Sequence, residues 1–196
     1  FLVSAHNRAL LFNEDEAVIS GGNFHGEPMA LPFDVLGIAC SEIASISERR
    51  TERMVNAALS NGLTPFLTTV GGVTSGFMIV QSSAASMASE NKVLAHPACV
   101  DSIPSSANQE DFVSMGTTAA RKAGTILQNT LSCLAFELLT ACQAIDIRRL
   151  QNTCGTGLSP VGEAVFSRVR QDVAFMEIDR EIWPDIEAVE RIVRSG

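Results

Sequence analysis

Apolar residues recur at helical spacing over three long stretches of this chain. These stretches run from about Phe33 to Leu59, from Ser75 to Leu94 and from about Asp111 to Arg149. Apolar side chains spaced three and four residues apart form one face of an α-helix, so each stretch predicts a helix that buries one side. The third helix would be roughly 55 Å long at 1.5 Å per residue. Helices of that length are typical of long bundles, often shared between subunits.

Turn-forming residues mark the expected ends of the first of these helices. Pro28 suits the first turn of a helix, where its missing N–H costs little, but Pro32 suits that turn less well. Regular helix is therefore expected from near Pro32. Ser60-Asn-Gly62 is expected to end it, because glycine just past the last turn readily adopts the left-handed conformation.

Two shorter helices are expected after the third long stretch. Ser159 and Pro160 suit the N-cap and the first position of a helix that runs to about Phe175. Asp179 is expected to cap a last helix that reaches Arg194. We interpret this tail as a packing subdomain.

The sequence predicts an all-α fold in three parts. A lead-in with a glycine-rich loop covers residues 1–26 and includes a brief strand at Ala17-Val-Ile19. A core of long helices covers residues 27–154 and contains a polar loop at 96–111. A C-terminal helical subdomain covers residues 155–196.

Charge and cysteine content exclude several classes of partner. Lys and Arg number 14 against 22 Asp and Glu, which gives a net charge of -8 and argues against nucleic acid and anionic membranes. No run of about 18 uncharged apolar residues predicts a membrane span. Five cysteines without a CxxC motif or metal-like spacing fit the reduced thiols of a cytoplasmic protein without a metal site.

One polar stretch, from Ser105 to Asp111, stands out between the second and third helical patterns. It follows Pro97 and Pro104. In one interpretation Asn108 is the N-cap of the long helix, with acidic residues in the first turn near the positive end of its dipole. In the other, Glu110 faces a substrate as part of a binding or catalytic wall. The stretch alone favours capping.

A glycine-rich loop, Gly21 to Pro28, precedes the first long helix. Its three glycines allow positive φ and close backbone approach, so the loop can fold tightly around another group. Phe24 and His25 lie within it. They either complete a turn, with Phe24 in the core and His25 bonded to a carbonyl, or face a ligand.

Four segments resemble the aromatic amino-acid lyase family, and most of all its histidine lyases. They are SGGNFHGEP (20–28), GGVTSGFMIVQ running into MASENKVLAHPA (71–98), DSIPSSANQEDFVSMG (101–116), and a C-terminal segment similar to the last helix of the family (179–196). The strings FHGEP and ANQED separate histidine lyases from plant-type phenylalanine lyases, which resemble FQGTP and NQD instead.

The resemblance implies a fold, an assembly and a reaction. The fold is an elongated bundle of long helices, part of a fumarase/aspartase-like lyase fold that assembles as a homotetramer. The reaction removes ammonia from L-histidine to give urocanate in histidine catabolism. Its electrophile is a 4-methylidene-imidazol-5-one (MIO) group made from an Ala-Ser-Gly tripeptide, and a tyrosine acts as the base.

This chain contains neither the tripeptide nor any tyrosine. Thr74-Ser-Gly76 is a similar string, but it matches a different, non-catalytic part of the family. The chain is therefore expected to correspond to the C-terminal portion of such an enzyme and to be inactive alone.

The resemblance also assigns roles to individual residues. Glu110 matches the active-site glutamate, which binds the imidazole or ammonium of histidine or moves a proton. Phe24 matches the aromatic side chain beside the electrophile, and Met78 matches a side chain that borders the substrate ring. Supporting positions in the same motifs are His25, Glu27, Asn108 and Gln109.

Phe112 keeps a second interpretation open, because many histidine lyases have histidine at this position. A lyase or aminomutase for another aromatic amino acid fits the same motifs. A non-catalytic helical oligomerisation scaffold is a third possibility, which the sequence preceding this chain would decide.

Overall fold

The computed structural model describes residues 9–12, 14, 17–20, 25–153, 155 and 157–195. The chain forms two compact units. Unit 1 comprises residues 1–39 and 94–125, and unit 2 comprises residues 40–93 and 126–196. Two long helices are divided between the units, and a third contributes its last residue, Leu94, to unit 1. The division into three parts suggested by the sequence stays a prediction.

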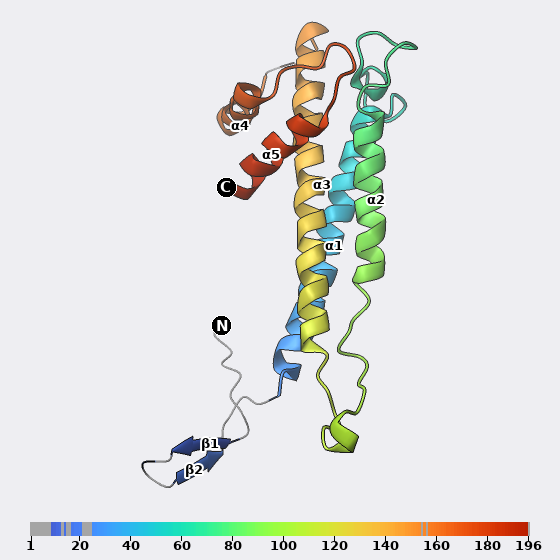
Figure 1. Ribbon diagram of the computed structural model, residues 1–196. Helices are drawn as coiled ribbons and strands as arrows, with labels where there is room; N and C mark the ends of the chain where they lie inside the picture. Colours follow the sequence, from blue (N-terminus) through green and yellow to red (C-terminus); the bar gives the residue numbers. More distant parts are fainter. Residues whose placement is uncertain are drawn as a thin grey trace. The chain divides into compact units, whose positions relative to one another are not determined.

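Helices dominate the described residues, with one β-hairpin near the N-terminus (Figure 1). The elements are β1 (Ala9–Phe12), β2 (Ala17–Ser20), α1 (Glu27–Val55), α2 (Met78–Leu94), α3 (Gly116–Leu150), α4 (Pro160–Asp172) and α5 (Trp183–Ser195). The two strands pair antiparallel, with Ala9 opposite Ser20. The predicted helical fold is confirmed, and β2 contains the predicted short strand.

The start of α1 lies earlier than the sequence predicted. The carbonyl of Gly26 accepts two backbone N–H groups at 3.0 Å, which closes the first turn at Glu27. Pro28 lies in that turn as predicted, but Pro32 lies inside the helix. The helix tolerates Pro32 because its missing N–H would have met the carbonyl of Pro28, so the only hydrogen bond lost is close to the helix start.

The end of α1 also differs from the prediction. The helix stops at Val55, before the expected Leu59. A separate turn follows, closed by the Ser60 N–H on the carbonyl of Asn56 at 2.9 Å. Gly62, with φ 95°, therefore ends this turn and not the helix.

The start of α3 corrects the capping interpretation of the polar loop. The helix begins at Gly116, not near Asp111. Met115 before it has φ 53°, and the Ser102 hydroxyl accepts the Val113 N–H at 2.8 Å, which holds that residue in the connection between α2 and α3. Asn108 is thus too far from the helix to cap it.

One of the two predicted C-terminal caps is confirmed. Ser159 accepts the N–H of Gly162 at 3.1 Å at the start of α4. The prediction for Asp179 is wrong, because α5 begins only at Trp183. The Asp179 carboxylate instead accepts the N–H groups of Ser75 and Gly76 at 2.7 and 2.9 Å, just before α2.

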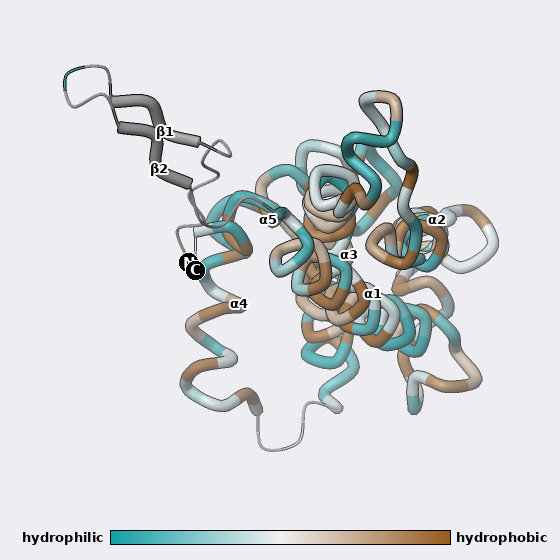
Figure 2. The backbone as a smooth tube through the Cα atoms, turned by 90° about the horizontal axis from the view of Figure 1, so that it is seen from below, coloured by the Kyte–Doolittle hydropathy of each residue, from teal (hydrophilic) through white to brown (hydrophobic). Residues whose placement is uncertain are grey.

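The core of unit 2 lies where α2 packs beside the unit-2 parts of α1 and α3, with α4 and α5 against α3 (Figures 1 and 2). Small residues let α2 approach closely, since the Cys133 thiol on α3 lies 3.7 Å from the carbonyl of Ala84. The largest fully buried side chains include Phe77, Phe136, Leu139, Ile147, Val80 and Val189.

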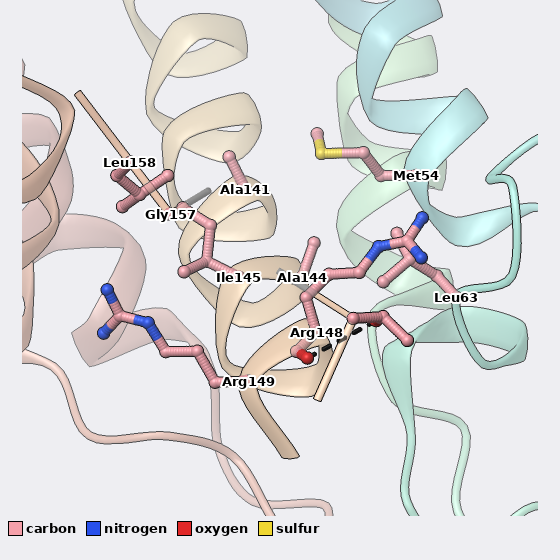
Figure 3. Close-up of a pocket in the computed structure, with 10 residues that line it drawn as sticks. Met54, Leu63, Ala141, Ala144, Ile145, Arg148, Arg149, Gly157 and Leu158 are labelled. Atoms are coloured by element: carbon pink, nitrogen blue, oxygen red, sulfur yellow. Dashed lines mark hydrogen bonds between the residues drawn. The ribbon is translucent and has the colours of Figure 1, made fainter. Parts of the chain in front are cut away.

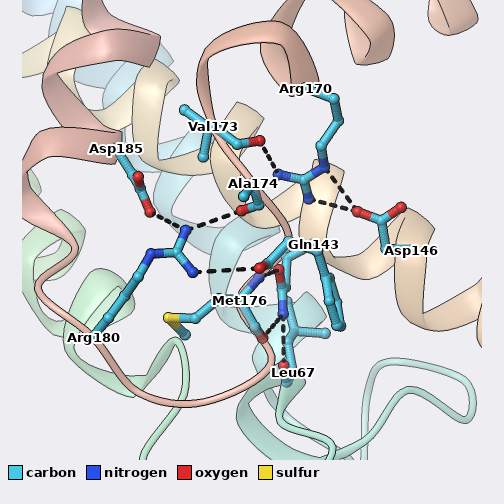
Figure 4. Close-up of polar contacts among 10 residues, drawn as sticks. Leu67, Gln143, Asp146, Arg170, Val173, Ala174, Met176, Arg180 and Asp185 are labelled. Carbon is cyan, nitrogen blue, oxygen red and sulfur yellow. Dashed lines mark hydrogen bonds and ion pairs between the residues drawn. The ribbon is translucent and has the colours of Figure 1, made fainter.

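A buried amide ties the segment after α4 to this core (Figure 4). Gln143 on α3 is 1% exposed. Its carboxamide donates to the carbonyl of Met176 at 2.8 Å and accepts the N–H of the same residue at 3.1 Å. It also donates to the carbonyl of Leu67 at 3.3 Å. This pairing explains why α4 stops at Asp172 and not at the predicted Phe175.

Two helices, α1 and α3, are long and apolar enough to cross a membrane by length and composition, where the sequence analysis expected none. In the most apolar window of α3, 61% of the residues are buried, as in the core helix of a folded domain. The corresponding window of α1 is 28% buried. Because core helices meet the same criterion, the absence of a membrane partner stays a prediction.

Candidate active site

The polar loop ends in a tight left-handed turn that leads into Glu110. Ser105 and Glu110 face each other across this turn and exchange two backbone hydrogen bonds, of 2.9 and 3.2 Å. Ser106, Ala107 and Asn108 between them have φ of 52°, 54° and 67°. Left-handed backbone costs a residue other than glycine about 1–2 kcal/mol. Strain of this kind clusters at active sites and ligand clamps, so the turn is a candidate site in its own right.

The three polar residues predicted here lie at different depths. Asn108 and Gln109 are exposed, whereas the side chain of Glu110 is half-buried. Since none of them caps α3, the helical explanation for their clustering no longer holds.

A stacked ring pair joins the polar loop to the segment that precedes α1. The imidazole of His25 lies on the phenyl ring of Phe112, with ring centroids 5.5 Å apart and planes at 29°. His25 Nδ1 accepts the N–H of Glu27 at 3.2 Å. The other nitrogen, Nε2, therefore donates to the carbonyl oxygen of Phe112, also at 3.2 Å. Unit 1 thus brings together two motifs that the sequence analysis selected separately.

The carboxylate of Glu27 lies in the same segment. Its Oε2 is buried and has no hydrogen-bond partner among the described residues. Leaving such an acceptor unsatisfied costs about 1–3 kcal/mol, so this oxygen is suited to a donor from a ligand or from another part of the protein. Phe24, the aromatic residue of the same motif, lies outside the described residues.

Asp34 on α1 is a functional candidate that the sequence analysis missed. It is 5% exposed, and its Oδ2 accepts the N–H groups of Ala98 and Cys99, both at 2.8 Å. Its Oδ1 lies 3.4 Å from Nζ of Lys122 on α3, and Lys122 also donates to the carbonyl of His96. Burial alone would raise the pKa of Asp34, but the two amides and the lysine bring it below its ordinary value.

The sequence carried no clear signal for Asp34, because most of the large apolar side chains of α1 lie on a different, exposed face. The fully buried face of α1 consists of Ala30, Ala44, Ser47 and Thr51. Asp34 lies on that face, four residues after Ala30. An acidic residue at a buried position requires a partner, because an unpaired buried charge is costly.

Met78 lies in unit 2, as the first residue of α2, and is 43% exposed. It borders a cavity of about 340 Å³ that Phe66, Val73 and the preceding loop also line. Gly76 in that loop has φ 55°, and a Cβ there would lie 2.4 Å from the carbonyl oxygen of Phe66. Glycine is needed for this close approach, which gives Thr74-Ser-Gly76 a structural role.

A second cavity of about 360 Å³ lies at the end of α3 (Figure 3). Mostly apolar residues, two arginines and Thr153 line it, and none of the predicted site residues that the structure describes does. Arg148 donates to the carbonyls of Ser60 and Asn61 at 3.0 and 2.7 Å, and Arg149 pairs with Glu163 at 2.7 Å. Both cations are thus engaged within unit 2. Among the residues the structure describes, no cluster of His, Cys, Asp and Glu is grouped to hold a metal ion.

Comparison with curated proteins links the chain to lyases. It is 54% identical over 187 residues to histidine ammonia-lyase 1 of Fusobacterium nucleatum, covering 95% of this chain and 36% of that protein. It is 57% identical over 194 residues to histidine ammonia-lyase of Caldanaerobacter subterraneus, covering 98% of this chain and 37% of that protein. The chain therefore spans little more than a third of the length of these relatives.

Solved structures and a family model agree with this relationship. Histidine ammonia-lyase from Trypanosoma cruzi superposes with a TM-score of 0.84 at 48% identity, over 91% of this chain and 34% of that one. Tyrosine aminomutase from Streptomyces globisporus superposes with a TM-score of 0.83 at 37% identity, over 94% of this chain and 34% of that one. The model of the aromatic amino acid lyase family matches residues 2–171. The chain belongs to the aromatic amino acid lyase family.

Proposed function

We propose that this chain is the C-terminal portion of an ammonia-lyase that removes ammonia from L-histidine to give urocanate in histidine catabolism. The observation that carries the proposal is the joining of the segment around His25 to the polar loop of Glu110 through Phe112. Both segments bear the motifs that resemble histidine lyases. The identities of 54% and 57% to histidine ammonia-lyases support the same substrate.

Glu110 is the residue we assign to the chemistry. A half-buried carboxylate can accept a charge-assisted hydrogen bond from an imidazole N–H or an ammonium group. Such a bond contributes about 1.5–3 kcal/mol, enough to orient the substrate or to move a proton during the elimination. A phenyl ring offers no N–H donor to this carboxylate, whereas an imidazole does, which favours histidine over phenylalanine.

The remaining predicted residues are assigned to binding. Phe24 is assigned to the lining beside the electrophile, and Met78 to the border of the substrate ring. His25, Glu27, Asn108 and Gln109 are assigned supporting roles.

The MIO electrophile does not belong to this chain, which lacks the Ala-Ser-Gly tripeptide that would form it. A tyrosine base is likewise absent from its sequence. Both groups would be supplied by the rest of the parent protein, and the chain alone is expected to be inactive.

The parent protein is proposed to act in the cytoplasm as a homotetramer without nucleic-acid or membrane partners. Six large apolar side chains of α1 are between 42% and 63% exposed, a face suited to burial against another subunit: Leu31, Val35, Leu36, Ile38, Ile43 and Ile46. The net charge of -8 supports the exclusion of nucleic acid. The mass of the purified parent by light scattering tests the assembly.

The second candidate is a lyase or aminomutase for another aromatic amino acid. The TM-scores of 0.84 and 0.83 favour neither a histidine ammonia-lyase nor a tyrosine aminomutase, so the fold does not discriminate. Identities of 48% against 37%, together with Glu110, favour the histidine reaction. A non-catalytic scaffold would require a parent without the tripeptide and tyrosine.

The test is an assay of the intact parent protein on histidine, phenylalanine and tyrosine, with products followed by ultraviolet absorbance. We expect urocanate from histidine and a loss of more than about tenfold in kcat/KM for Glu110→Gln, equivalent to about 1.4 kcal/mol of transition-state stabilisation. Glu187→Gln, on the exposed side of α5, is the control. Products from the other amino acids alone would favour the second candidate, and full activity of Glu110→Gln would remove Glu110 from the mechanism.

A further inference from the structure

The connection between α2 and α3, residues 95–115, carries Glu110 at the far end of a series of cross-links. Nearest the helices, the N–H groups of Ala98 and Cys99 bind the Asp34 carboxylate. Further along, the Ser102 hydroxyl accepts the N–H of Val113 at 2.8 Å. At the tip, Ser105 and Glu110 form their pair of backbone bonds.

Each cross-link limits the freedom of the next. We call residues 98 and 99, which bind Asp34, the base of the connection. With the base held, the bond between Ser102 and Val113 fixes the spacing of the two segments of the connection. The backbone pair of Ser105 and Glu110 at the tip then fixes the backbone of Glu110. The base is the only one of these links that is tied directly to α1 and α3, through Asp34 and Lys122.

The acidic side chain at the base of the connection is also buried. Asp34 is 5% exposed, and the side chain of Lys122 is 20% exposed. A hydrogen bond that involves a charged and buried group is stronger than one in an exposed turn, such as the backbone pair of Ser105 and Glu110.

We infer that Asp34, together with Lys122, is a positioning residue that holds the connection between α2 and α3 and thereby places Glu110 for the elimination. This inference rests on the proposed function. Asp34 does not touch the substrate; it acts through the amides of Ala98 and Cys99.

Two variants of the intact parent test the inference. Asp34→Ala removes both acceptor oxygens and the charge. Asp34→Asn keeps one oxygen for the two amides, but it loses the charge and places an NH2 group opposite Lys122. Asp146→Asn is the matched control, because it weakens the ion pair of 2.7 Å with Arg170, also made by α3 but in unit 2. If Asp34→Ala fails to fold, Asp34→Asn carries the test.

The first measurement is hydrogen exchange of the backbone amides of residues 98–113. We expect exchange to be at least tenfold faster in Asp34→Ala, intermediate in Asp34→Asn and unchanged in the control. Unchanged exchange in both Asp34 variants would overturn the inference. This measurement needs no substrate, so it decides the role of Asp34 in holding the connection even if the parent proves not to form urocanate.

The second measurement is a double-mutant cycle with Glu110→Gln on urocanate formation. Asp34→Ala is expected to lower kcat/KM at least tenfold in the parent, but less than twofold when Glu110 is already replaced. An equal loss in both backgrounds would show that Asp34 only stabilises the fold, and would overturn the positioning role.

Discussion

The imidazole of His25 stacks on Phe112 and donates to the carbonyl oxygen of that same residue. One side chain thereby makes two kinds of contact with a residue 87 positions away in the chain. The aromatic contact depends on the side chain at position 112, while the hydrogen bond depends only on its backbone. Substitutions at positions 25 and 112 therefore test the ring contact and the hydrogen bond separately.

Removing the imidazole should loosen the polar loop. His25→Ala in the parent is expected to lower kcat/KM for histidine by at least about fivefold. An exposed hydrogen bond contributes about 0.5–1 kcal/mol and a stacked ring pair about 0.5–1.5 kcal/mol. His25→Phe keeps a ring to stack but loses the hydrogen bonds, so its loss should be smaller. Steady-state kinetics of both variants provide the measurement, and wild-type values for His25→Ala would contradict it.

Replacing the ring of Phe112 should lower activity less than replacing the imidazole of His25. Phe112→His retains the backbone acceptor and offers another flat ring to His25. We expect urocanate formation within about threefold of the parent, because a stacked pair contributes about 0.5–1.5 kcal/mol and a similar one can form. Relative kcat/KM for histidine and phenylalanine gives the readout. A switch of substrate in this variant would instead make Phe112 the residue that determines specificity.

Gly76→Ala is expected to destabilise the protein by about 2 kcal/mol or more. The residue has φ 55°, and the new Cβ would lie 2.4 Å from the carbonyl oxygen of Phe66. Gly71→Ala, in the same loop, has no heavy atom within 4 Å of its new Cβ and serves as the control. Urea denaturation of the parent and both variants compares the unfolding free energies, which should fall for Gly76→Ala alone.

Acid should weaken the fold through two buried carboxylates. Burial alone would raise the pKa of Glu48, but hydrogen bonds from Arg49 and Gln81 lower it, as the amides and lysine do for Asp34. Each group therefore binds fewer protons in the folded state. Its stabilisation is complete above the ordinary values of 3.8 for Asp34 and 4.5 for Glu48, and is lost as pH falls through the lowered values.

Denaturation measured from about pH 6 down to about pH 3 tests this dependence. Asp34→Asn and Glu48→Gln should each be less stable than the parent near neutral pH and lose less stability on acidification. Parallel curves for the parent and both variants would rule out these carboxylates as the source.

The thiols of Cys133 and Cys142 should resist alkylation in the folded protein. Burial raises the pKa of each to about 11, and the nearby Glu48 carboxylate adds to the effect at Cys133. At pH 8 only about one thiol in a thousand is then ionised. Peptide mapping after iodoacetamide treatment should find both at least about a hundredfold slower than in denaturant; rapid labelling of either in folded protein would contradict its burial.

The long helices were predictable because their apolar residues repeat at helical spacing. The prediction that this face is buried is wrong for α1, where most of its large apolar side chains are exposed. The ends of the helices were less predictable, because distant or strained groups decide them: the Gly26 carbonyl starts α1, and Met115 with φ 53° delays α3. Asp179 follows the local rule for a cap but finds the amides of Ser75 and Gly76 instead.

The candidate site divides in the same way. Glu110 and His25 could be predicted because each belongs to a motif of consecutive residues. Their connection through the backbone of Phe112 could not, because it depends on which loops the fold brings together. Asp34 was not predictable, because it lies on the face of α1 opposite most of the large apolar side chains. Its partners at Ala98, Cys99 and Lys122 also depend on how the chain folds.

Gln143 pairs with both main-chain groups of Met176, as an adjacent strand would. These two hydrogen bonds fix the main chain of residue 176 and do not depend on its side chain. At its exposed positions, the segment between α4 and α5 should therefore accept changes of sequence more easily than changes of length, whereas Val173 and Met176 are buried in the core. Inserting or deleting one residue in this segment would present the wrong peptide unit to Gln143 and shift every residue that follows by one position.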